Sequence, residues 1–168
     1  RHPVAGLAAH LPLDAGSRQL LSAFAPRGQV SQLRVTWEGN AEGLQAYALK
    51  ARFDHLALKA KGAFPGASGL SGLVDASEHG GSATLDSKAV RIDLPLVFPE
   101  SSIALDTLKV QTSWKISKGV LDAELSSMEF TGSDAAGSAR GTFRHAADGP
   151  GRIDLTAALT RAEATAVW

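Results

Sequence analysis

The sequence predicts a mostly β protein built on a curved antiparallel meander sheet, which is either open and taco-like or sandwich-like. Apolar and polar residues alternate with a period of two from residue 29 onward, as they do in half-buried strands. Glycine-rich turns separate these runs at intervals typical of all-β folds. The same order of strands and turns occurs twice, over about 29–98 and 103–160, which predicts two internal repeats in an elongated sheet.

The N-terminal residues show a different pattern. Residues 1–13 contain two prolines and no clear period, which predicts a lead-in or linker. Residues 14–25 have helical spacing, with Asp14 as the N-cap and Pro26 as the stop. We therefore expect one N-terminal helix, and a single β-rich domain over residues 14–168 that is a fragment of a longer protein.

The first repeat begins with an alternating strand over 33–37 and a return strand over 47–53. The apolar parity changes between Phe53 and Leu56. Such a change predicts a β-bulge at Asp54–His55.

Glycines mark the rest of the first repeat. The glycine-rich segment 64–72 leads into a strand at about 70–77, and residues 78–81 predict a hairpin turn with Gly-Gly chemistry. Further strands end at Leu85 and cover 90–98.

The second repeat has the same order of alternating strands and turns. Its expected strands cover 108–116, 121–130, 139–143 and 153–159. A turn is expected at 117–119, and the alternation slips by one residue at Ser126–Ser127.

Strands of this kind are apolar on one side and polar on the other, so the sheet has an apolar face and a polar face. The residues expected on the apolar face, as groove lining or as core, are Leu33, Val35, Trp37, Leu49, Phe53, Leu70, Leu85, Val110, Trp114, Leu125, Phe143 and Leu155. Trp37 and Trp114 occupy equivalent places in the repeats. They are interpreted as core anchors, with the rim of a lipid or sugar groove as the alternative.

The composition excludes several classes of function. Lys+Arg and Asp+Glu both total 17, so the chain lacks the basic excess that nucleic acids require. It has no cysteine, and the five histidines do not show metal-ligand spacing. The segment Gly66–Leu70 fails the G-x-S-x-G pattern of a hydrolase elbow. No catalytic, metal or cofactor residue is therefore predicted, and we expect a protein that is not an enzyme.

The order of several short motifs carries a family resemblance. They are Leu33-x-Val-x-Trp37, the glycine-rich run Phe64–Gly72, Leu85-Asp-Ser87 followed by Leu94-Pro-Leu-Val-Phe98, and Leu105-Asp-x-Leu108 with Trp114. Together they resemble the YhdP branch of the AsmA-like family. The resemblance covers the chain from about Asp14 to the C-terminus.

The resemblance implies a place in the Gram-negative envelope. Members of that family are large proteins with one inner-membrane helix and a β-rich periplasmic body. The body resembles bridge-like lipid-transfer proteins, in which a curled sheet encloses an apolar groove. The resemblance therefore implies a periplasmic internal segment, with the membrane anchor outside this chain.

The expected function is that of a non-enzymatic segment whose apolar groove serves phospholipid transport to, or maintenance of, the outer membrane. Its partners would be phospholipid acyl chains and adjacent segments of the same long chain. The alternative is a structural or interaction module for envelope assembly, with a filled core and no ligand. An envelope hydrolase is a third reading that would need clustered carboxylates or a Ser/His pair in a pocket.

Overall fold

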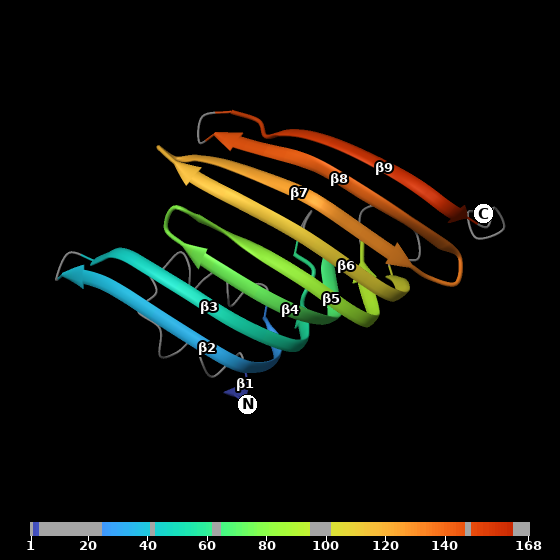
Figure 1. Cartoon of the computed structure of the whole chain (residues 1–168), viewed down its shortest axis with the longest axis horizontal. Helices are drawn as coiled ribbons and strands as arrows, with labels where there is room; N and C mark the ends of the chain where they lie inside the picture. The colour runs from blue at the N-terminus through green and yellow to red at the C-terminus, as the bar shows by residue number, and fades with distance from the viewer. Residues whose placement is uncertain are drawn as a thin grey trace.

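The computed structural model describes residues 2–3, 25–40, 43–61, 65–94, 102–146 and 149–162. These residues form one antiparallel sheet of nine strands, and the strand order in the sheet equals the order in the chain (Figure 1). The strands are β1 (His2–Pro3), β2 (Arg27–Asn40), β3 (Gly43–Leu58), β4 (Gly66–Ser77), β5 (Gly80–Asp93), β6 (Ser102–Ser117), β7 (Val120–Thr131), β8 (Ala135–Ala146) and β9 (Arg152–Ala162). The predicted mostly β class and the open, curved meander are confirmed.

Two parts of the predicted architecture are not tested by this sheet. Residues 14–24 of the expected helix lie outside the described residues, and its last residue, Ala25, is not helical. The division into two repeats remains a prediction, as does the domain boundary at residue 14.

The strands are longer than the alternation predicts. β5 is one strand of 14 residues, whereas the sequence pattern separates a strand ending at Leu85 from one beginning at Val90. The turn before it is shorter than expected, because only Glu78 and His79 form the turn and Gly80 already pairs with Ser77. The glycines therefore belong to the strand rather than to the turn.

The predicted irregularities are confirmed. The β3–β4 register shifts between Phe53 and Leu56, where the parity change predicted a bulge. The β7–β8 register shifts between Leu125 and Met128, where the alternation slips. The turn at Lys118–Gly119 also forms, and both residues have positive φ as a type I′ hairpin requires.

A crease crosses the middle strands of the sheet. Three residues on successive strands have left-handed backbone, namely His55 (φ 52), Gly69 (φ 79) and Ala89 (φ 54). Gly69 and Ala89 are neighbours, since a Cβ on Gly69 would lie 2.6 Å from the carbonyl oxygen of Ala89. His55 lies on the other side of β4, where its backbone N–H donates to the Ser71 hydroxyl. Bulges that line up across strands bend a sheet, and Figure 1 shows β4 and β5 turning sharply at one end.

Two serines replace the ladder hydrogen bonds that the crease interrupts. The Ser87 hydroxyl accepts from the Ser71 backbone N–H at 2.9 Å and donates to the Ser71 carbonyl oxygen at 3.1 Å. The Ser71 hydroxyl in turn accepts from the His55 backbone N–H at 3.2 Å. The Ser87 side chain is buried, and its two hydrogen bonds satisfy part-buried backbone groups of Ser71.

The core lies inside this crease. Its buried apolar residues form one cluster, which consists of Phe53, Leu70, Val90, Leu105 and Leu108. Val90 lies beyond the left-handed Ala89 and Leu108 lies before the bend, yet both belong to the cluster. Residues on the two sides of a crease can meet only on the inside of the bend. The apolar face is therefore the concave face of the sheet.

Candidate functional site: an open apolar face

The register connects apolar positions into rows that cross the sheet from β2 to β9. One row pairs Val35 with Leu49 on β3 and continues to β9. Its remaining members are Ala76, Gly81, Trp114, Ala123, Phe143 and Ile153. A second row runs from Leu33 through Ala51 to Leu155 on β9. The rows run perpendicular to the strands, so the apolar surface is continuous from β2 to β9.

The structure places every residue that was expected on the apolar face on this side of the sheet. Phe53 and Leu70 are buried in the crease cluster, whereas the other ten are half-buried or exposed. The interpretation of Trp37 as a core anchor is wrong, because 55% of its surface is exposed. Trp37 lies near the end of β2, where no described strand covers it. Whether these residues line a groove stays a prediction.

Burial along the face is greatest in the middle strands and decreases towards both β2 and β9. Val90 and Leu108, at the crease, are 1% and 3% exposed. Ile153, Leu155 and Leu159, on the edge strand β9, are 69%, 57% and 64% exposed. Leu33 and Trp37, on β2, are 38% and 55% exposed. The middle of the apolar face is thus a packed core, and the parts towards β2 and β9 are open.

Two glycines keep aromatic side chains flat against the sheet. A Cβ on Gly81 would lie 2.7 Å from Cζ2 of Trp114, and a Cβ on Gly137 would lie 3.0 Å from Cζ of Phe130. Each ring therefore occupies the space that a side chain on the neighbouring strand would fill. The arrangement leaves a broad, shallow apolar surface instead of upright side chains that would close it.

Several apolar residues of this face were not predicted from the sequence. Ile153 and Leu159 lie on the strand that the sequence predicts at 153–159, so their alternation is a usable signal. Val90, Leu105 and Leu108 form most of the core, but nothing in their pattern distinguishes them from the exposed positions.

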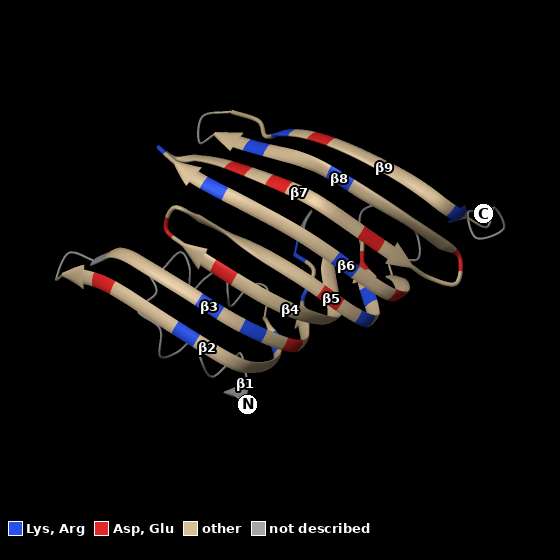
Figure 2. Cartoon of the chain, viewed as in Figure 1, with Lys and Arg blue, Asp and Glu red and all other residues tan. Residues whose placement is uncertain are grey.

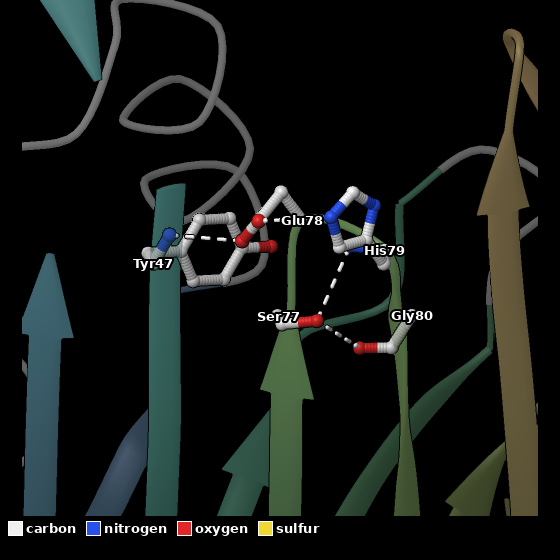
Figure 3. A network of polar contacts seen from close by, with 5 residues as sticks. All are labelled: Tyr47, Ser77, Glu78, His79 and Gly80. Atoms are coloured by element: carbon white, nitrogen blue, oxygen red, sulfur yellow. Dashed lines mark hydrogen bonds and ion pairs between the residues drawn. The ribbon is translucent and has the colours of Figure 1, made fainter. Parts of the chain in front are cut away.

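A polar cluster closes the turn between β4 and β5 (Figure 3). The backbone N–H of Tyr47 donates to the Glu78 carboxylate at 2.9 Å, beyond the last β3–β4 pair. This hydrogen bond holds the pKa of Glu78 below its ordinary value of 4.5. The Ser77 hydroxyl accepts from the His79 backbone N–H and donates to the Gly80 carbonyl oxygen. The His79 imidazole contacts Glu78 and not the serine, so we interpret the cluster as one that stabilises the turn.

Other chemistry is sparse in the described part of the chain. Among those residues, no group of three or more His, Cys, Asp or Glu could hold a metal ion. Within the same residues, no helix has the length and apolarity to cross a membrane. An envelope hydrolase would need a Ser/His pair. At the turn Ser77–Gly80 the serine hydroxyl contacts the backbone of His79 and Gly80 and not the His79 imidazole, so this turn does not supply one.

The fold and the apolar face define the structural class of this protein. The described residues form a single open antiparallel sheet with a continuous apolar concave face. The family comparison agrees with that class. The model of the family described as YhdP protein matches residues 2–168, and the chain belongs to this family. Membership suggests an envelope protein of the lipid-transport type, and the family is not a known enzyme family. Searches among curated proteins and among solved structures gave no match.

Proposed function

We propose that this chain is a non-enzymatic periplasmic segment that covers phospholipid acyl chains on its apolar face and so serves lipid transport to, or maintenance of, the outer membrane. The observation that carries the proposal is the continuity of the apolar rows from β2 to β9 together with their exposure. Contiguous exposed apolar surfaces mark interaction sites in soluble proteins. In this proposal a helix outside this chain supplies the membrane anchor.

The energetics favour an acyl chain as occupant. Each CH₂ group removed from water contributes about 0.8 kcal/mol, so an apolar face that covers part of an acyl chain needs no specific polar contact. The rings of Trp114 and Phe130 lie flat, so they add apolar area without blocking access to the apolar face. Such a surface would accept chains of different length, which suits transport better than selection of one lipid.

A second candidate is an assembly module without a ligand, and the edge strand β9 favours it. All residues of β9 are exposed, and β9 pairs only with β8 among the described strands. A free edge with exposed apolar side chains is suited to strand addition. Under this candidate, an adjacent segment of the same long chain or an envelope partner would cover Ile153, Leu155 and Leu159.

Native mass spectrometry with lipid extraction separates the two candidates. The protein purified from a Gram-negative host is expected to carry phospholipid. Leu125→Asp places a charge in the middle of the apolar face, opposite Thr112 and Gly141, and is expected to lower lipid occupancy at least about tenfold, since a buried unpaired charge costs several kcal/mol.

The matched control is Gln111→Asp, which places the same charge on the polar face of neighbouring β6. It should keep the lipid occupancy of the unchanged protein. A lipid-free protein that also ignores added phospholipid would contradict the proposal and favour the assembly module. Equal loss in both variants, with circular dichroism showing that both fold, would contradict it as well.

A further inference from the structure

The polar face carries a hollow that the apolar face does not explain. It has a volume of about 870 Å³ and lies over β2, β3, β4 and β5. Paired positions of the polar face line it in two rows, one of which runs Arg34, Lys50, Asp75 and Ser82. The other row holds Gln32, Arg52, Leu73 and Thr84. Leu33, Ala51 and Val74, which lie between these two rows, also border the hollow. Their apolar-face neighbours Val35, Leu49 and Ala76 do not line it, so the hollow opens on the polar face.

The charges in this hollow do not balance. Its lining has three cations, Arg34, Lys50 and Arg52, and one carboxylate, Asp75. Lys50 pairs with Asp75 at 3.1 Å, and both side chains are largely exposed. No acidic side chain of the described residues pairs with Arg34 or Arg52. Figure 2 shows the basic positions of β2 and β3 close together in the sheet.

The register makes this arrangement unfavourable in the absence of an anion. Arg34 lies directly opposite Lys50, and Arg52 follows Lys50 by two residues on the same face. Like charges directly opposite each other on a sheet are destabilising. An anion placed between the two guanidinium groups would remove the repulsion, and guanidinium is suited to bidentate contact with phosphate oxygens.

A second hollow provides an internal comparison. It has a volume of about 550 Å³ and lies over β5 to β9. Charged polar-face residues line it, and Gly81, Trp114, Ala123 and Phe143 from the apolar row also border it. Its charged lining is balanced: Lys115, Arg144 and Arg152 face Asp122, Glu124 and Asp154. Arg144 and Asp122 form an ion pair at 3.5 Å. The basic excess is therefore particular to the hollow over β2–β5 and is not a general property of the polar face.

An apolar side chain lies beside the cations. Leu73 is opposite Arg52 and Thr84 on the polar face and is 45% exposed. The other large exposed apolar residues of the described chain follow the parity of the apolar face. The hollow thus combines two unpaired guanidinium groups, an ammonium group and one apolar contact.

We propose that this hollow binds the phosphate group of an amphiphile, with the phosphate between Arg34 and Arg52 and the adjoining apolar part on Leu73. Lys50 adds charge but is partly neutralised by Asp75. The site lies on the face opposite the acyl-chain surface and does not depend on it. The same cations could hold free phosphate, so the test separates the two sources.

Isothermal titration calorimetry at low ionic strength uses two probes, inorganic phosphate and hexyl phosphate. The double substitution Arg34→Gln with Arg52→Gln is expected to weaken hexyl phosphate binding by about 10–100-fold, because charge-assisted hydrogen bonds from exposed arginines are lost. The control is Arg144→Gln with Arg152→Gln, which removes the same net charge from the balanced hollow. It should change the affinity by less than about twofold, since only long-range charge is lost.

Single substitutions identify the source of the phosphate. Leu73→Ser should reduce hexyl phosphate binding to the level of inorganic phosphate and leave inorganic phosphate binding unchanged. Leu125→Asp, on the other face, should change neither. Equal affinity of the unchanged protein for both probes would overturn the amphiphile and leave a site for free phosphate. Three results would overturn the site. Neither probe binds; the two double variants lose affinity equally; or only Leu125→Asp loses affinity for hexyl phosphate.

Discussion

Leu108→Ala is expected to lower the free energy of unfolding by about 2–5 kcal/mol, as large-to-small changes in packed cores do. Leu108 is 3% exposed and belongs to the crease cluster with Phe53, Leu70, Val90 and Leu105. The described strands form a single layer, so no second sheet among them can share the loss. The cluster should therefore carry a large part of the stability, and urea denaturation measures it.

Leu159→Ala is the matched control for this experiment. The same side chain is removed from the same face, but Leu159 is 64% exposed on β9. Its free energy of unfolding should change by no more than about 0.5 kcal/mol, as for other surface substitutions. Similar losses in the two variants would mean that the whole apolar face is packed, which contradicts an open surface.

Gly69→Ala is expected to destabilise the crease strongly. Gly69 has a φ of 79°, and left-handed backbone costs a residue with a Cβ about 1–2 kcal/mol. The new Cβ would also lie 2.6 Å from the Ala89 carbonyl oxygen, so the strands must separate and strain the adjacent Ser71–Ser87 hydrogen bonds. The loss should therefore exceed the conformational cost alone, and chemical denaturation measures it.

Ala89→Gly is the reciprocal change across the same crease. Ala89 has a φ of 54° and bears the left-handed cost in the natural sequence. Glycine removes that cost but increases the entropy of the unfolded chain, so the free energy of unfolding should stay within about 1 kcal/mol. If both substitutions destabilised equally, backbone conformation would not be what maintains the bend.

The alternation of apolar residues predicts the parts of the fold that depend on local pattern. The period of two identifies the meander and assigns residues such as Leu49 and Leu125 to a common face. The parity changes at Phe53–Leu56 and Leu125–Met128 locate two bulges, because an inserted residue reverses the alternation that follows it.

The depth of burial depends on the crease and could not be predicted from the pattern. His55 and Ala89 adopt left-handed backbone although neither is glycine, so no residue type marks the bend. Leu108 and Leu155 have the same local alternation, yet one is buried inside the bend and the other is exposed on the edge strand. Trp37 was assigned to the core for the same reason.

The basic hollow depends on register in a similar way. Arg34 and Arg52 are 18 positions apart in the sequence, and isolated basic residues on alternating strands predict only a solvated face. They become neighbours because β2 and β3 pair Arg34 with Lys50 and Gln32 with Arg52. The sequence alone does not specify that pairing.

The most direct test of the open apolar face is methyl NMR with a paramagnetic acyl probe. The probe is the methyl ester of a doxyl-labelled stearic acid, which lacks the anionic group that would favour the basic hollow. We expect broadening of the methyl signals of Leu125 and Leu155, while those of Thr84 and Thr142, on the polar face, keep their intensity. Equal broadening on both faces, or no broadening at saturating probe, would contradict it.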